Sequence, residues 1–124
     1  MDFKDLIGAK LIAVFDNGFS IQKDNKAYNF TFEDYEGDCC GYNNIETVLL
    51  ISDDNQDLNP IITDIKYHKE ETGESEVAEI VFFGIDKEIY KVNCLSSSSS
   101  GWCYGACVRL TCKQLKFDKV ITSW

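Results

Sequence analysis

The sequence has little proline, little histidine and, over one long stretch, no basic side chain. One proline and one histidine occur among its 124 residues. Because scarce proline and a 44% apolar content favour a chain that buries its own core, we expect a single domain over residues 1–124. The lone histidine, His68, supplies no Ser-His-Asp or Cys-His-Asn set. We therefore interpret it as a surface residue and expect a binding protein rather than an enzyme.

Long apolar runs are also missing. Nothing approaches the roughly 18 apolar residues that a membrane-spanning helix needs. The opening MDFKDLIGAK has charges where a secretory signal would have an uninterrupted apolar segment. We therefore expect a cytoplasmic protein, bound to no membrane, whose six cysteines stay reduced rather than pairing as disulfides.

Basic residues are absent between residues 27 and 65, where nine acids equal the formal net charge of −9. Such a chain is repelled by nucleic acid and attracted to basic protein surfaces, so we expect a protein partner and no direct nucleic-acid binding. A solvated acidic face that only keeps the protein in solution is the alternative. The candidate partner-binding residues are Glu33, Asp34, Glu36, Asp38, Asp53, Asp54 and Asp57.

Alternating apolar and polar residues predict a mainly β fold. Tyr28, Phe30 and Phe32 alternate with polar residues, and Asn17-Gly18 between two apolar runs is a strong hairpin signal. We expect antiparallel sheets of about seven or eight short strands. The predicted strands cover residues 10–15, 18–22, 27–34, 60–68, 77–85, 88–94 and 106–115.

Helix is scarce in the pattern. Residues 2–8 are expected to form one or two helical turns, and residues 43–51 fit helix or strand, so an α+β fold is the alternative. A faint internal repeat relates Asp5-Leu6, before one apolar strand, to Asp57-Leu58, before another. We take it as a hypothesis of two similar β units.

Four of the six cysteines lie in the segment CLSSSSSGWCYGACVRLTC, residues 94–112. Cys103 and Cys107 have the spacing of paired zinc ligands, and flanking glycines allow the backbone to turn toward thiolate sulfurs. A serine loop after Cys94 would return the chain so that Cys94 meets Cys103. The fourth ligand would come from Cys39 or Cys40, and four thiolates would make the site structural.

Two other interpretations of the cysteines stay open. They are burial as small apolar residues, and a disulfide or redox role. Cys112 alternates in register with Val108 and Leu110, so we assign it to the core.

The chain resembles a family of small phage and prophage proteins. The resemblance rests on DLIGAKLIAV, YNFTFEDYEGDCCGYNNIETV and SSGWCYGACVRL, with Leu6-Ile7-Gly8, Asp38-Cys39-Cys40 and residues 101–108 as its motifs. A histidine that the family often has shortly before the cysteine pair is absent here, where residues 33–38 read EDYEGD. A cysteine-rich, acidic chain of this kind is also similar to zinc-containing anti-CRISPR proteins of the type II systems of streptococci and their relatives.

The resemblance implies inhibition of a Cas9 effector by binding, with zinc as a structural cofactor, and we expect the inhibitor to be a monomer. Three rivals remain. The first is a phage protein that sequesters a nucleotide immune signal with Trp102, Tyr104 and Arg109. The second is a metal-stabilised interaction module with another partner. The third is a thiol enzyme with Cys103 or Cys107 as nucleophile.

Protein purified without added metal should contain about one zinc per chain, bound by Cys94, Cys103, Cys107 and one of Cys39 or Cys40. Because metal binding is coupled to folding, Cys103→Ser should lower the melting temperature far more than Cys112→Ser, which buries one hydroxyl at a cost of about 1–3 kcal/mol. Elemental analysis and thermal unfolding measure the two quantities. A protein without zinc, or equal losses at both positions, would favour plain burial of the cysteines.

Overall fold

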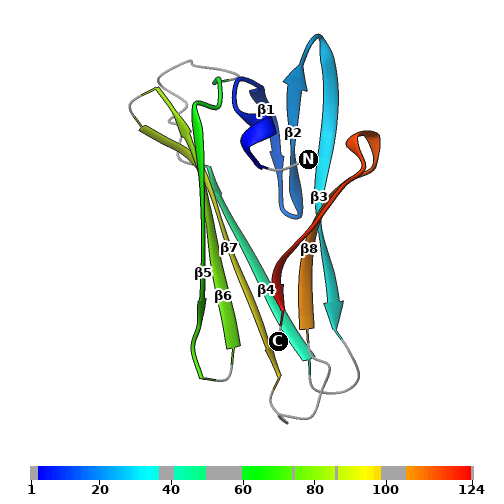
Figure 1. The fold of residues 1–124 in the computed structure, drawn as a ribbon, viewed down its shortest axis with the longest axis vertical. Helices are drawn as coiled ribbons and strands as arrows, with labels where there is room; N and C mark the ends of the chain where they lie inside the picture. Colours follow the sequence, from blue (N-terminus) through cyan, green and yellow to red (C-terminus); the bar gives the residue numbers. More distant parts are fainter. Residues whose placement is uncertain are drawn as a thin grey trace.

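Two antiparallel sheets packed face to face make up the protein (Figure 1). The structure, a computed structural model, describes residues 3–36, 41–49, 60–73, 75–85, 87–98 and 106–123. Nine strands and two 3-10 turns lie in these ranges. The prediction of a mainly β fold is therefore confirmed.

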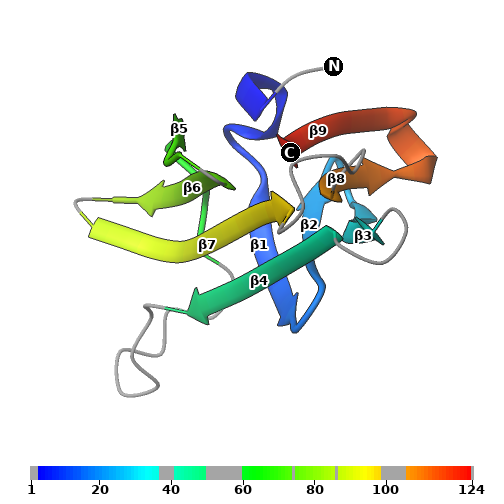
Figure 2. The same ribbon diagram turned by 90° about the horizontal axis from the view of Figure 1, so that it is seen from below.

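The five-stranded sheet has the order β1-β2-β3-β8-β9, and the four-stranded sheet has the order β4-β7-β6-β5 (Figure 2). The strands of the first sheet are β1 (Lys10–Phe15), β2 (Gly18–Lys23), β3 (Lys26–Glu36), β8 (Ala106–Cys112) and β9 (Phe117–Ser123). Those of the second are β4 (Gly41–Leu49), β5 (Asp64–Glu71), β6 (Ser75–Gly84) and β7 (Lys87–Ser98).

The two halves of the chain have the same connectivity. In the first half β1, β2 and β3 form a meander in one sheet, and β4 crosses to the other sheet, where it pairs with β7. In the second half β5, β6 and β7 form the opposite meander, and β8 crosses back to pair with β3. The hypothesis of two similar β units therefore has a topological counterpart, with β9 as an addition to the second unit.

Several local predictions differ from the structure. The helix expected over residues 2–8 is a four-residue 3-10 turn, η1 (Phe3–Leu6), and the ambiguous segment 43–51 is strand over its described part. The strand predicted from residue 60 begins at Asp64. The serine run, predicted as a loop from Ser96, continues β7 through Ser98, because each of these serines pairs with β4.

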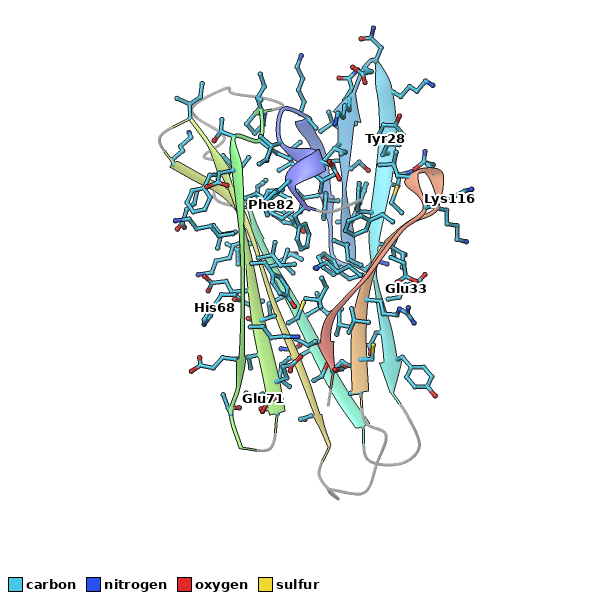
Figure 3. All side chains as sticks on the ribbon, in the orientation of Figure 1. Tyr28, Glu33, His68, Glu71, Phe82 and Lys116 are labelled. Carbon is cyan, nitrogen blue, oxygen red and sulfur yellow. The ribbon has the colours of Figure 1, made fainter. Side chains whose placement is uncertain are left out.

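Aromatic rings fill the space between the sheets. Phe19 stacks on Phe30 at 5.0 Å between ring centroids, and Phe82 and Tyr90 meet Phe19 edge-on from the other sheet at 5.1 and 5.7 Å. All four are fully buried, and Figure 3 places Phe82 between the sheets. Such contacts contribute about 0.5–1.5 kcal/mol each beyond the burial of area.

The segment before β5 connects the two sheets. Ile62 exchanges backbone hydrogen bonds of 2.8 Å with the stretch before β1, its amide donating to Ala9 and its carbonyl accepting from Gly8. One residue later the Thr63 amide donates to the Phe83 carbonyl of β6 at 2.7 Å. Within residues 60–63, Pro60 and Ile62 therefore bond to the β1 side and Thr63 to β6, which explains why the strand prediction began too early.

The two hairpins of the first meander use their turn residues differently. Asp24 and Asn25, between β2 and β3, both have positive φ, which Asn and Asp tolerate in a two-residue hairpin loop. Gly18 has no positive φ; instead, a Cβ on it would lie 2.0 Å from the Phe30 carbonyl oxygen. Close approach of β3, rather than turn geometry, requires glycine there.

Gly18→Ala should therefore destabilise the protein by about 3 kcal/mol, the upper range for overpacking, because the atom it meets is backbone and cannot rotate away. Chemical denaturation with circular dichroism measures the change. Gly73→Asn is the matched control. Gly73 has a φ of 62°, which Asn tolerates, and a Cβ added there would meet no atom of the described residues within 4 Å. A Gly18→Ala protein as stable as the Gly73→Asn protein would contradict this role for the close contact.

Candidate metal centre and docking surfaces

The strands flanking both cysteine-bearing connections end together. Glu36, the last residue of β3, pairs with Ala106, the first of β8, and Gly41, the first of β4, pairs with Ser98, the last of β7. We call these four strand ends the cysteine end; it is the lower end of Figure 1. Connections 37–40, with Cys39 and Cys40, and 99–105, with Cys103, thus start and finish at neighbouring positions. The three cysteines themselves lie outside the described residues.

The two other predicted ligands are described, and they face different ways. Cys107 follows Ala106 at the cysteine end and is half-buried on the outer face of the five-stranded sheet. Cys94 lies four residues before the end of β7, pairs with Ile45 and Ala78, and is 3% exposed in the core between the sheets. The structure therefore brings Cys107, but not Cys94, to the cysteine end. Cys112 is buried in the core, as predicted.

Burial sets the ionisation of the free thiols. It raises the pKa of Cys94 to about 12, so this side chain is a neutral thiol near pH 7. Burial also raises the pKa of Cys107, and the positive charge of Arg109 opposes part of that rise. Neither thiol has the depressed pKa of a cysteine nucleophile. Within the described ranges, no three His, Cys, Asp or Glu side chains are grouped to hold a metal ion.

Of the predicted partner-binding acids, Glu33 and Asp34 are described with their side chains, and both are exposed near the cysteine end of β3. The Asp34 carboxylate accepts a hydrogen bond from Asn43, so it also has a structural role. Glu36 is described only in its backbone, and Asp38, Asp53, Asp54 and Asp57 lie outside the described residues. β4 runs from Gly41 at the cysteine end to Leu49, so the segment 50–59 begins after the opposite end of that strand.

A hollow of about 520 Å³ lies on the outer face of the five-stranded sheet beside the cysteine end. Its lining includes Glu33, Tyr35, Cys107 and Arg109, and Tyr35 is 63% exposed. Arg109 donates to both carboxylate oxygens of Asp118 at 3.0 Å, which raises its pKa further. Because its Nε and Nη2 groups are engaged by an acid of the same sheet, a phosphate would have to compete with Asp118 for that edge of the Arg109 guanidinium. Trp102 and Tyr104 lie outside the described residues.

A second hollow, of about 390 Å³, lies on the outer face of the four-stranded sheet, and the sequence did not single it out. Figure 3 shows His68, one of its lining residues, pointing away from the other sheet. The carboxylates of Glu46, Glu70 and Glu79 come to it from β4, β5 and β6. These acids are far apart in the sequence; only the strand order of the folded sheet brings them together.

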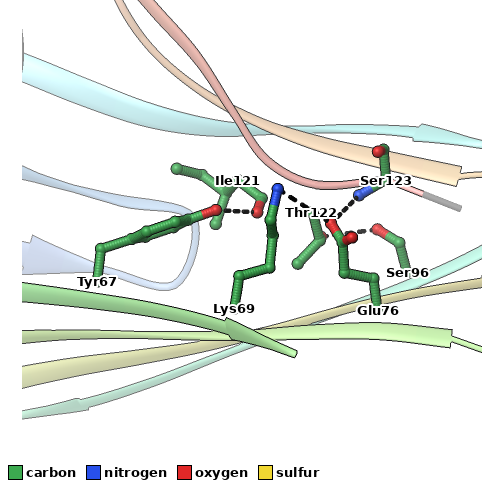
Figure 4. Close-up of polar contacts among 7 residues, drawn as sticks. All are labelled: Tyr67, Lys69, Glu76, Ser96, Ile121, Thr122 and Ser123. Atoms are coloured by element: carbon green, nitrogen blue, oxygen red, sulfur yellow. Dashed lines mark hydrogen bonds and ion pairs between the residues drawn. The ribbon is translucent and has the colours of Figure 1, made fainter. Parts of the chain in front are cut away.

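Polar side chains connect the two sheets near the cysteine end (Figure 4). The Tyr67 hydroxyl of β5 donates to the Ile121 carbonyl of β9, and the Ser123 amide donates to the buried Glu76 carboxylate at 3.0 Å. Lys69 lies 3.8 Å from the same carboxylate. These contacts fix β9, the edge strand of the five-stranded sheet, to the four-stranded sheet.

Asn43 and Ser96 extend this network to the interior. The Asn43 amide nitrogen donates to the backbone carbonyls of Tyr35 at 2.9 Å and Cys107 at 3.3 Å. The Ser96 hydroxyl donates to the Asn43 side-chain carbonyl at 2.6 Å and lies 2.7 Å from the Thr122 hydroxyl. Ser96 thus belongs to the buried contact between the sheets, a role that its place in a serine run conceals.

A comparison with protein families, with curated proteins and with solved structures finds no match for this chain. No helix in the described ranges has the length and apolar character needed to cross a membrane.

Tyr67→Phe should destabilise the protein by about 1 kcal/mol at pH 7, because it removes the hydroxyl that bonds the Ile121 carbonyl between the sheets. Burial, followed by the negative charge of Glu76, raises the Tyr67 pKa to about 12 from 10.0. The unfolded chain therefore loses this proton first, and the stability that the phenol contributes falls as pH rises from about 10 to 12. Chemical unfolding at pH 7 and at pH 11 should show a smaller loss of stability with pH in Tyr67→Phe than in the native sequence.

Tyr90→Phe is the control, because the fully buried Tyr90 hydroxyl has no hydrogen-bond partner among the described residues. Removing an unpaired buried hydroxyl should leave stability at pH 7 unchanged or slightly raised. Equal destabilisation by the two substitutions would show that the Tyr67 hydroxyl bond does not stabilise the sheet contact.

Proposed function

We propose that this chain is a non-catalytic phage protein that inhibits a type II Cas9 effector in the bacterial cytoplasm by binding to it. Two things support the proposal: the resemblance to zinc-containing anti-CRISPR proteins, and the positions of Cys107, Glu33 and Asp34 near one end of the fold. The observation that carries it is the cysteine end. The pairs Glu36–Ala106 and Gly41–Ser98 bring both cysteine-bearing connections to the same end of the sandwich as the exposed acids of β3.

In the proposed mechanism, zinc is structural. Cys107 and the cysteines of the two connections would hold the ion and fix those connections against the strand ends. Cys94 lies in the core away from the cysteine end, so Cys39 and Cys40, together with Cys103 and Cys107, would make an alternative set of four sulfurs. The metal would then stabilise the shape of the docking surface without touching the partner.

The acids would provide attraction. Cas9-type effectors hold their guide and target nucleic acids in positively charged channels. A protein of net charge −9 is drawn to such a surface, and exposed Glu33 lies near the cysteine end, where we propose that contact is made. Binding there would block the loading or the cleavage of target DNA.

The test is cleavage of target DNA by purified streptococcal-type Cas9 with guide RNA, titrated with this protein. Inhibition should be complete near equimolar protein, and undiminished cleavage at tenfold excess across several such Cas9 proteins would refute the proposal. Glu33→Lys should slow association about two- to tenfold at low salt with little change in dissociation, because a rim charge acts mainly on the encounter.

Two variants locate the contact. Glu88→Lys is the matched control, since Glu88 is an exposed acid at the opposite end of β7. The triple change Asp53→Lys, Asp54→Lys, Asp57→Lys tests the acids of segment 50–59, which follows the last residue of β4, Leu49. A larger effect of the triple change than of Glu33→Lys would move the docking surface to the other end.

A further inference from the structure

The outer face of the four-stranded sheet has an ordered arrangement of side chains. The strand register gives two adjacent rows that run across all four strands. One row has an apolar centre, and the other consists of polar side chains throughout. In the order β4, β7, β6, β5 the rows are Asn44, Leu95, Val77, Glu70 and Glu46, Asn93, Glu79, His68. These eight side chains line the hollow of about 390 Å³.

The charge of this face is distributed unevenly. Glu79 forms an ion pair of 3.1 Å with Lys91, its neighbour on β7. Within the described part of the chain, Glu46 and Glu70 form no ion pair with a basic side chain. Two exposed carboxylates at opposite edges of the hollow are therefore available to a cation from outside.

The floor of the hollow limits what that cation can be. Val77 and Leu95 are half-buried and apolar, so they suit a ligand with methylene groups beside its charge. The side chains of Asn44 and Asn93 add hydrogen-bonding groups at the same depth. A flat cation on an alkyl stem can bond one carboxylate while its stem lies on the apolar floor, whereas a bare metal ion would leave the apolar floor unused.

We propose that this hollow receives an arginine side chain from a basic segment of a protein partner. The guanidinium would bond Glu46 or Glu70 with two parallel N–H···O bonds, and its stem would lie on Leu95 and Val77. The inference concerns a different face from the cysteine end and does not require the partner to be Cas9.

Titration with a short capped Arg-Leu-Arg peptide, followed by backbone amide shifts of the zinc-loaded full-length protein, tests the proposal. The peptide should shift residues of β4, β6 and β7 around the hollow. It should bind several-fold more tightly than Lys-Leu-Lys, and its isosteric citrulline counterpart, which lacks the charge, should not bind. Equal binding of the citrulline peptide would overturn the proposal, and equal binding of the lysine peptide would reduce it to a nonspecific cation surface.

Variants of the protein sharpen the test. Glu46→Gln with Glu70→Gln should weaken binding about tenfold or more, as expected for loss of charge-assisted bonds, while Glu88→Gln, outside the hollow, should have no effect. Lys91→Met should strengthen binding, because it frees Glu79 from its ion pair.

A Glu46→Gln, Glu70→Gln protein that binds like the native sequence refutes the site. Because the assay contains no Cas9, that failure would not contradict the proposed inhibition. A failure to inhibit Cas9 would likewise not contradict the arginine site.

Discussion

The antiparallel pairing of β3 with β8, and of β4 with β7, is the constraint on which the rest of the structure depends. Each pairing joins a strand of one half of the chain to a strand of the other, so each sheet is completed by a strand from the opposite meander. The aromatic core joins the two sheets, since Phe19 and Phe30 come from one and Phe82 and Tyr90 from the other. The same pairings place the two crossing connections beside each other.

This exchange explains which features the sequence could predict. Alternation of Val108, Leu110 and Cys112 identified the buried face of β8 correctly, because alternation is a local property. Local patterns could not reveal that residues 60–63 bond to two sheets, or that Ser96 bonds Asn43 across a separation of 53 residues. Gly18 was correctly placed at a hairpin, but the carbonyl of Phe30, on the next strand, is what demands glycine.

The candidate sites show the same difference between what local patterns predict and what long-range pairing determines. Sequence spacing grouped Cys94 with Cys103, but a serine run that continues β7 leaves Cys94 in the core, and the pairing of Glu36 with Ala106 instead places Cys107 beside the connections. Counting acids along the chain selected a segment, whereas the hollow of the four-stranded sheet combines acids from three strands. Only strand order determines such a surface, and strand order is set by pairings distant in the sequence.

The contacts that fix β9 have a consequence for self-association. An edge strand offers unpaired amides and carbonyls to strands of other molecules, which is how sheet proteins polymerise. Here the Ile121 carbonyl and the Ser123 amide are occupied by Tyr67 and Glu76, side chains of the opposite sheet. A foreign strand would have to displace both, and it would leave the buried Glu76 carboxylate without its amide donor. This end of β9 is therefore closed to edge-to-edge growth by groups of its own molecule.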